Sequence, residues 1–312
     1  MGLVIIGAGM AGLLAARMLH RREPVIVLEK QPSLPHNHNA VLRFSSPIVG
    51  DVLGIPFKRV MMTKTVIPWR NPVADAMAYS EKVLGEYRTD RSVLLPERWQ
   101  SAERFIAPPD LVERMAEGVD IEFDTPYDFL EGGNKVISTI PMPVLAKLMN
   151  YPDPIEFVWV RGITVLATIE DCEAYASVLV PDPHVPFYRA SITGDRLIVE
   201  LADKYPNDIN SGETAYMAAM FLGVDRSRVG HASVRETDYA KIAPIPEAQR
   251  RNFIYWASTI KGRAYQLGRY ATWRPGLQLD DLVKDIRIIE GWINSSSPLY
   301  DQEEHERRKA SA

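Results

Sequence analysis

Short runs of consecutive apolar residues alternate along the chain with segments of helical periodicity. The runs Leu3–Ile6 and Val25–Leu28 are rich in β-branched residues, which is typical of strands buried in a parallel sheet. Between them, closely spaced apolar residues from Leu13 to Leu19 predict a helix. This strand–helix–strand order predicts a βαβ unit at the start of the chain.

Further elements are predicted downstream. Residues 119–123 alternate like a half-buried strand, and residues 163–169 and 196–201 favour strands of a second sheet. Residues 212–222 favour a helix. An amphipathic helix is predicted near the carboxyl end from the apolar positions Leu282, Val283, Ile286, Ile289 and Trp292. The pattern predicts an α/β fold that starts with a Rossmann-like domain.

A glycine motif separates the first strand from the first helix. It has the spacing G-x-G-x-x-G and consists of Gly7, Ala8, Gly9, Met10, Ala11 and Gly12. In dinucleotide-binding folds the first glycine makes a tight turn, the second lets the backbone approach a pyrophosphate, and the third lets the helix pack on the strand. The helix N-terminus presents N–H groups and a positive dipole end to the phosphates. The motif therefore predicts a dinucleotide site.

An acidic residue follows the second strand. Glu29 lies 22 residues after Gly7, where its carboxylate can accept both ribose hydroxyls of an adenosine. It argues against a 2′-phosphate, because like charges would meet, although the adjacent Lys30 softens this argument. The chain has no second G-x-G-x-x-G, which argues against a separate NADPH domain.

Two later segments add to the pattern. Residues 136–141, VISTIP, predict a strand that runs into a tight turn. Residues 267–281 read LGRYATWRPGLQLDD and lead into the late helix. Gly276 frees the chain where that helix starts, and Asp280 and Asp281 complement the helix dipole.

Together the glycine motif, VISTIP and LGRYATW…LDD resemble the glutathione-reductase-type FAD fold, most closely the group of amine oxidases and UDP-galactopyranose mutases. The segment PFYRAS, residues 186–191, is similar to a substrate-domain strand of the mutases. The resemblance implies FAD as the cofactor. It also implies that Glu29 holds the adenosine ribose, that Thr139 lies near the dinucleotide, and that Arg269 faces the flavin.

The resemblance assigns the start of the late helix to the flavin pyrimidine ring. The N–H groups that it implies come from Gly276, Leu277 and Gln278. Such a helix end would stabilise the anionic reduced ring as oxyanion donors do.

The same resemblance implies a Rossmann-like FAD-binding domain with an interleaved α+β substrate domain, in a chain that leaves the FAD domain and returns to it. The FAD-binding domain is expected over residues 1–45, 100–150 and 262–312, and the substrate domain over 46–99 and 151–261. The chain departs from the family over residues 31–39, which contain no glycine where the family often has a pair.

Composition limits the partners and the location. The formal net charge of −4 gives no overall basic field to attract nucleic acid or a membrane. The longest apolar run, residues 3–16, is too short to cross a bilayer. The single cysteine, Cys172, cannot form an internal disulfide and indicates a reducing compartment. We therefore expect a cytoplasmic protein.

Charge is distributed unevenly along the chain. Residues 150–213 hold 11 acidic and 4 basic side chains, whereas residues 226–274 hold 10 basic and 3 acidic ones. The basic segment predicts either a solvated surface or a basic wall beside the flavin for an anionic or nucleotide-like substrate. A second basic stretch would join such a wall through Arg88, Arg91, Arg98 and Arg104.

Candidate catalytic residues come from the segments expected to border the flavin: Tyr188, Arg189, Arg269 and Trp273. The arginines would clamp a carboxylate or phosphate, and the aromatic residues, with Tyr265 and Tyr270, would wall the substrate pocket. A structural ion pair and core packing are the alternatives. Lys241 and Lys261 are weaker candidates for a base. No metal site is expected, and His36 and His38 are assigned to a polar loop.

The chemistry that these features favour is oxidation of a C–N bond. Hydride transfer from an amine needs an aligned C–H, a fixed anion and a dry pocket. Hydrolysis of the imine then gives an amine and a carbonyl compound, so the enzyme would be an oxidase or lyase acting on an amine or amino-acid-like group.

In its length, its glycine motif and its arginine-rich C-terminal half, the chain also resembles the bacteriophage FAD-dependent lyases of thymidine hypermodification. This narrower resemblance implies conversion of glycyl-modified thymidine to aminomethyl-deoxyuridine and glyoxylate, and a location in the host cytoplasm. A substrate within DNA would have to be single-stranded or flipped out. Two alternatives stay open: a mutase-like flavoenzyme acting on a nucleotide sugar, and a noncatalytic dinucleotide-binding module. The sequence leaves the oligomeric state open.

Overall fold

The computed structural model describes residues 2–34, 43–85, 99–127, 135–202, 210–259 and 264–294. The chain divides into two compact units. Unit 1 comprises residues 1–57, 107–156 and 245–312, and unit 2 comprises residues 58–106 and 157–244. Relative to the domains predicted from the sequence, residues 46–57, 151–156 and 245–261 fall in unit 1, and residues 100–106 fall in unit 2.

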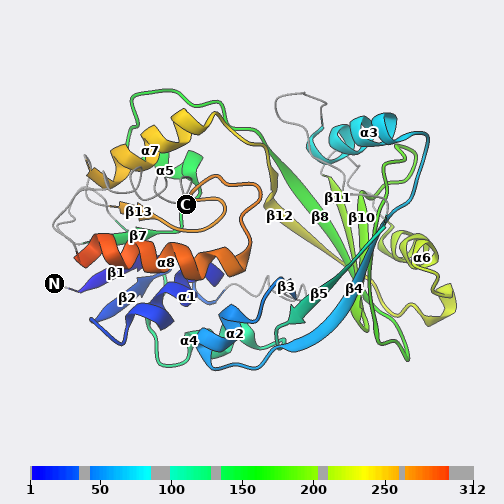
Figure 1. Ribbon diagram of the computed structural model, residues 1–312, viewed down its shortest axis with the longest axis horizontal. Coiled ribbons are helices and arrows are strands. Elements are labelled where there is room, and N and C mark those ends of the chain that lie inside the picture. Colours follow the sequence, from blue (N-terminus) through cyan, green and yellow to red (C-terminus); the bar gives the residue numbers. More distant parts are fainter. Residues whose placement is uncertain are drawn as a thin grey trace, which may run out of the picture. The chain divides into compact units, whose positions relative to one another are not determined.

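Unit 1 is built on a parallel sheet with the strand order β13-β7-β1-β2-β6 (Figure 1). Its strands are β1 (Leu3–Ile6), β2 (Val25–Leu28), β6 (Asp120–Glu122), β7 (Val136–Ser138) and β13 (Ala264–Gln266). All four residues of β1 are buried, as expected for a central strand with both faces covered. The two strands predicted at the start of the chain are confirmed.

The other elements of unit 1 are the short strand β3 (Arg43–Phe44) and the helices α1 (Met10–Leu19), α2 (Ile48–Leu53), α4 (Leu111–Ala116), α5 (Met142–Leu148), α7 (Glu247–Thr259) and α8 (Leu279–Asn294). Helix α1 contacts α8, drawn in red in Figure 1, as well as α4. The predicted apolar positions Leu282, Val283, Ile286 and Ile289 of α8 are buried. Among the described helices, none has the length and apolar composition needed to span a membrane.

Unit 2 is built on a mostly antiparallel sheet, in which its strands follow the order β12-β8-β11-β10-β9-β4-β5 and only β4 and β9 pair in parallel. The strands are β4 (Lys58–Val66), β5 (Trp99–Ile106), β8 (Trp159–Thr168), β9 (Ala174–Leu179), β10 (Arg189–Gly194), β11 (Arg196–Ala202) and β12 (Ser233–Ile242). The strands predicted over residues 163–169 and 196–201 correspond to β8 and β11.

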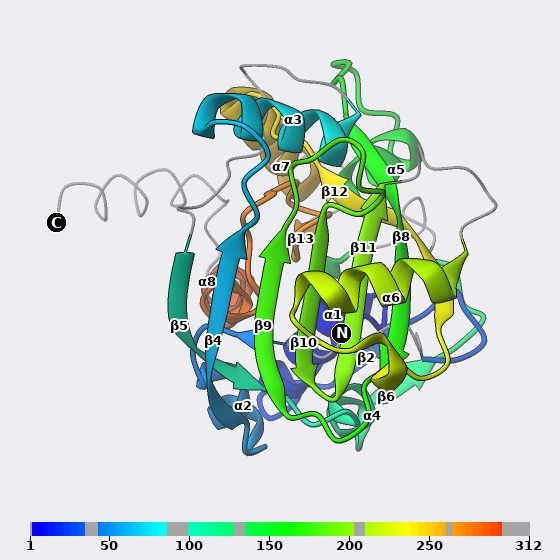
Figure 2. The same cartoon turned by 90° about the vertical axis from the view of Figure 1, so that its right-hand side faces the viewer.

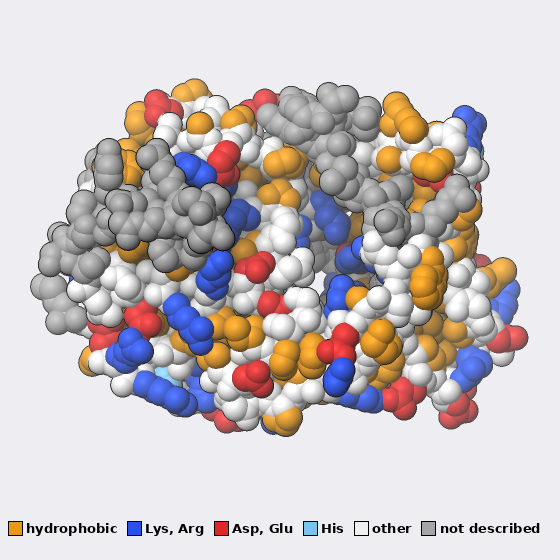
Figure 3. Space-filling view, in the orientation of Figure 1, with side chains coloured by type: hydrophobic (Ala, Val, Ile, Leu, Met, Phe, Trp, Pro, Cys, Tyr) orange, Lys and Arg blue, Asp and Glu red, His pale blue; other side chains and the backbone are white. Residues whose placement is uncertain are grey.

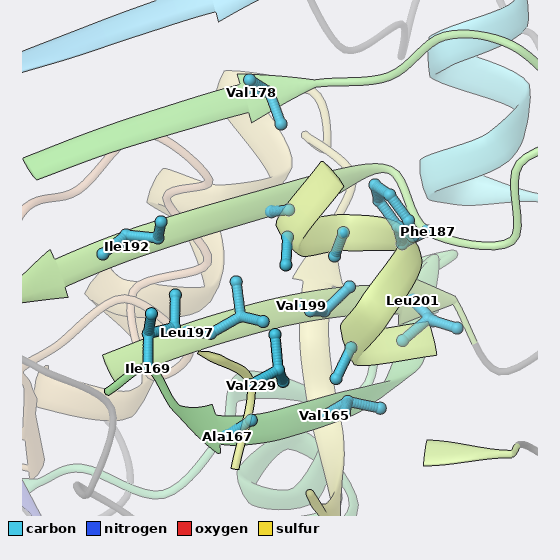
Figure 4. Packing of buried hydrophobic residues seen from close by; sticks show 14 of the residues in the cluster. Val165, Ala167, Ile169, Val178, Phe187, Ile192, Leu197, Val199, Leu201 and Val229 are labelled. Atoms are coloured by element: carbon cyan, nitrogen blue, oxygen red, sulfur yellow. The ribbon is translucent and has the colours of Figure 1, made fainter. Parts of the chain in front are cut away.

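Two longer helices cover unit 2: α3 (Pro72–Leu84) and α6 (Ser211–Phe221), with a 3₁₀ turn at Arg226–Arg228. Figure 2 shows α6 lying across β10, β11 and β8. The side chains beneath it form an apolar cluster, seen in Figure 4, that includes Phe187, Ile192, Leu197 and Val199. One face of this sheet therefore forms the core of unit 2, and the alternating residues lie on the opposite face.

Candidate functional site

The glycine motif forms the turn between β1 and α1. Gly7 has a φ of 97°, a conformation that L residues other than glycine rarely adopt, and its N–H donates to the Leu28 carbonyl at 2.8 Å. A Cβ on Gly7 would lie 2.2 Å from Thr139 Oγ1. The Thr139 hydroxyl in turn donates to the Ile6 carbonyl at 2.7 Å. Thr139, which the resemblance placed near a dinucleotide, thus packs against the turn itself.

The other two glycines of the motif differ in their surroundings. A Cβ on Gly12 would lie 1.9 Å from the Gly7 carbonyl oxygen, so α1 can pack this closely on the turn only with glycine here. A Cβ on Gly9 would meet no atom within 4 Å. Gly9 is the N-cap of α1, and no side chain caps this helix end. The open space beside Gly9 thus adjoins backbone N–H groups suited to an anion.

Glu29 is buried and tied to the same turn. Its carboxylate accepts the Ala8 N–H at 2.8 Å through Oε2 and the Gln31 N–H at 2.9 Å through Oε1. Each carboxylate oxygen can accept a further hydrogen bond, so the group can hold the turn and still accept ribose hydroxyls. Lys30 is exposed.

The segment after β13 returns to the first turn of α1. The Leu267 N–H donates to the Ser138 carbonyl at 3.0 Å, which extends the pairing with β7. Gly268 has a φ of 101°, and a Cβ on it would lie 3.2 Å from the Ala11 Cβ. Gly268 belongs to the quoted segment LGRYATW, but no role was predicted for it, although a glycine directly after a buried strand was the available signal.

Arg269 follows Gly268 and carries an unsatisfied donor. Its Nε is buried, and no described residue accepts a hydrogen bond from it. A buried N–H without an acceptor costs free energy, so such a group points to an acceptor that joins the site from outside the chain. Trp273, the other predicted catalytic residue of unit 1, is only 1% exposed. Its burial fits the core-packing alternative better than a pocket wall.

The start of α8 is already hydrogen-bonded within unit 1. The Leu277 N–H donates to the Arg274 carbonyl at 3.1 Å, and the Gln278 N–H donates to Asp281 Oδ2 at 2.9 Å. Two of the three N–H groups predicted to approach a flavin ring are therefore engaged by the chain. Gly276 is exposed, and a Cβ on it would meet nothing within 4 Å. The side chain of Asp280 accepts the Ser45 N–H at 2.7 Å.

Tyr188 and Arg189 lie in unit 2, at the start of β10. Arg189 forms an ion pair with Glu200 on β11, and the Tyr188 hydroxyl donates to the same carboxylate at 3.5 Å. Burial, reinforced by the Glu200 charge, holds the pKa of the Tyr188 phenol well above its usual range. The Lys241 ammonium lies 5.2 Å from the centroid of the Tyr188 ring. This arrangement matches the ion-pair alternative for Arg189.

The Arg189–Glu200 pair gives a stability prediction. We expect Arg189→Met to lower the free energy of unfolding by about 3 kcal/mol, because it leaves the Glu200 carboxylate largely buried without its cation. Urea unfolding measures the loss. Adding Glu200→Gln to this variant should recover part of it, and an Arg189→Met variant as stable as the wild type would contradict the assignment.

The basic segment over residues 226–274 spans parts of both units. Partners within the chain engage many of its basic side chains. Arg228 donates to the Glu170 carbonyl, Arg250 and Arg251 pair with Glu247, and Arg274 pairs with Asp285. Figure 3 shows basic and acidic side chains interspersed on the face in view. The described part of the segment supports the solvated-surface alternative over a basic wall.

Several predicted residues fall outside the described ranges: His36, His38, Arg88, Arg91, Arg98 and Lys261. Arg104 is described, and its guanidinium donates to the Glu103 carbonyl at 2.7 Å. Within the described ranges, no group of three His, Cys, Asp or Glu side chains could hold a metal ion.

Comparisons with known proteins identify the fold. No protein-family model matches the chain, nor does any curated protein sequence. Among solved structures, reduced UDP-galactopyranose mutase is 13% identical over 96% of this chain and 97% of its own, with a TM-score of 0.69. Aklavinone-11 hydroxylase in complex with FAD and aklavinone is 13% identical over 92% of this chain and 60% of its own, with a TM-score of 0.55.

A geranylgeranyl bacteriochlorophyll reductase-like protein from Thermoplasma acidophilum is also similar. It is 10% identical over 99% of this chain and 83% of its own, with a TM-score of 0.55. At such low identities the likeness establishes the fold alone. The chain has an α/β fold with a Rossmann-type parallel sheet, which confirms the predicted fold class.

Proposed function

We propose that unit 1 binds FAD and that the chain is an FAD-dependent oxidoreductase. The observation that carries this proposal is the turn at Gly7–Gly12, where open space beside Gly9 adjoins a helix end that no side chain caps. The buried, unpartnered Nε of Arg269 supports it, because the chain supplies that donor with no acceptor. The hydroxylase with this fold, whose complex contains FAD, is consistent with it.

Each residue of the site has a distinct role in this proposal. The backbone at Gly9 and the first N–H groups of α1 bind the pyrophosphate. Glu29 accepts the hydroxyls of the adenosine ribose while holding the turn through Ala8. Arg269 donates its free N–H to an oxygen atom of the cofactor, and Thr139 keeps the turn in place from β7.

The test is the visible spectrum of the purified full-length chain, followed by mass spectrometry of any nucleotide released on denaturation. We expect a yellow protein that releases FAD. A colourless preparation that leaves the spectrum of added FAD unchanged would refute the proposal. Release of NAD would show that the bound cofactor is NAD and not FAD.

A change at Glu29 should weaken both the turn and the cofactor site. In Glu29→Gln the amide has one acceptor oxygen for the two N–H groups that the carboxylate now accepts. We expect the dissociation constant for FAD to rise about tenfold, because one hydrogen bond to a charged group is lost. Fluorescence titration with FAD measures the change. An unaltered dissociation constant for FAD would show that Glu29 does not contribute to the cofactor site.

Within this class we propose that the reaction oxidises a C–N bond of an amine or amino-acid-like substrate. Bound FAD would supply the hydride acceptor. The support is the sequence resemblance to amine oxidases, and the narrowest form of the proposal is cleavage of glycyl-modified thymidine to aminomethyl-deoxyuridine and glyoxylate. A cytoplasmic location belongs to the same proposal and is supported by the single cysteine.

A screen of amines, including glycyl-modified thymidine, tests the proposed reaction by the loss of flavin absorbance and the appearance of a carbonyl product. An absorbance that no amine changes would contradict it. The second candidate is a mutase-like reaction on a nucleotide sugar. It is favoured by the structural similarity to reduced UDP-galactopyranose mutase, which extends over nearly the whole length of both chains. That candidate requires activity only after chemical reduction, and turnover without reduction would exclude it.

A further inference from the structure

The face of the unit 2 sheet opposite α6 carries hydroxyl groups. Along β10, Ala190 and Ile192 belong to the apolar cluster beneath α6, so Ser191 and Thr193 lie on the opposite face. Ser177 on β9 pairs in register with Ser191 and shares that face. We call Ser177, Ser191 and Thr193 the hydroxyl strip.

Some hydroxyl protons of the hydroxyl strip have no acceptor among the described residues. The three residues are 5%, 0% and 3% exposed, respectively. The hydroxyls of Ser177 and Ser191 lie 2.9 Å apart, so one donates to the other and one proton of the pair remains. Thr193 Oγ1 is buried and has no hydrogen-bond partner. Within the described part of unit 2, these groups thus offer two O–H donors to an external acceptor.

Two basic residues stand in register with members of the hydroxyl strip. Lys64 on β4 stands in register with Ser177, and Arg196 on β11 stands in register with Thr193. The carboxylate nearest along β11 is that of Glu200, which forms an ion pair with Arg189. Hydroxyl donors between cationic side chains suit an oxyanion, whereas an apolar ligand would leave both donors unsatisfied.

We propose that the hydroxyl strip binds an oxyanion group of the substrate, a carboxylate or a phosphate. This inference rests on the proposed function and adds to it the substrate class, an anionic molecule. Ser191 ends the PFYRAS segment, whereas Ser177 and Thr193 lie in no motif that the sequence offers, because isolated serines and threonines in a strand carry none.

The test is isothermal titration calorimetry of the full chain with four probes, namely two anions and the neutral counterpart of each. The first is glycyl-modified thymidine, which has a carboxylate, and the second is its glycinamide counterpart, which has the same size but no charge there. The third is thymidine 5′-monophosphate, which has a phosphate and no glycyl group, and the fourth is thymidine itself. We expect the wild type to bind at least one anion about tenfold more tightly than its neutral counterpart, glycinamide or thymidine.

The variant carries Ser191→Ala and Thr193→Val together. We expect its preference for the anion to fall to about one, while its affinity for the neutral probe stays unchanged. The matched control is Thr214→Val, a buried hydroxyl on α6 across the sheet, which should keep the full preference. Equal unfolding midpoints of the three proteins confirm that each is folded.

The probes also distinguish the anions and the modes of failure. Loss of the preference for the glycyl acid alone identifies a carboxylate, and loss of the preference for the monophosphate alone identifies a phosphate. Equal affinity of the wild type for charged and neutral probes overturns the inference and leaves the flavoenzyme proposal standing. A variant that weakens both kinds of probe equally also overturns it. A chain that binds no FAD refutes the proposed function independently of these titrations.

Discussion

Replacing Gly12 with alanine is expected to cost unit 1 about 3 kcal/mol or more of its free energy of unfolding. The added Cβ would lie 1.9 Å from the Gly7 carbonyl oxygen, and the obstacle is backbone rather than a flexible side chain. Either α1 moves away from β1 or the turn opens, and both changes uncover apolar residues of α1 such as Leu13 and Leu14, which are fully buried. Urea unfolding measures the loss.

The control for this variant is Gly291→Ala. Gly291 lies within α8, and a Cβ on it would meet nothing within 4 Å. Alanine is the better helix former by about 1 kcal/mol, so this substitution should leave the protein as stable or slightly more stable. If Gly12→Ala were as stable as Gly291→Ala, the close packing of α1 on the turn would be wrong.

Replacing Gly9 with valine is expected to separate cofactor binding from folding. Gly9 has φ and ψ of −75° and 177°, which valine adopts readily, and its Cβ would have no neighbour within 4 Å. The free energy of unfolding without cofactor should therefore change by no more than about 0.5 kcal/mol. The side chain would fill the space assigned to the pyrophosphate, so affinity for FAD should fall about 100-fold or more.

Fluorescence titration of each variant with FAD, beside urea unfolding without FAD, tests this separation. Gly291→Ala again serves as the control and should bind FAD like the wild type. If Gly9→Val kept the wild-type affinity, the phosphates would not bind at this turn. If it unfolded instead, the space beside Gly9 would be filled by the chain itself.

Local patterns were sufficient to predict the elements that build the candidate site. The apolar runs at Leu3–Ile6 and Val25–Leu28 coincide with β1 and β2, because a strand covered on both faces needs an unbroken apolar run. The spacing of the motif predicted which glycines the turn would need. The clash distances at Gly7 and Gly12 now give the physical reason for two of them.

Contacts between distant segments could not be predicted in this way. Gly268 approaches Ala11, although more than 250 residues separate them in the sequence. The local sequence around either residue does not indicate this contact. The sequence left two roles open for Arg189, an anion clamp and a structural ion pair, because a strand pattern does not show that Glu200 stands across from it on the next strand. Residues 46–57 were assigned to the second domain for the same reason, since their membership of unit 1 follows only from tertiary contacts.

Hydrogen–deuterium exchange of the full chain with and without FAD tests the central claim most directly. If FAD binds at the glycine turn, we expect slower exchange on addition of FAD in peptides that cover residues 7–12, which form the turn and the first helical residues. We expect the same in the segment that contains Arg269. We expect no change in peptides from β8, which belongs to unit 2. Protection confined to unit 2, or no protection at saturating FAD, would contradict the claim that this glycine turn holds the cofactor.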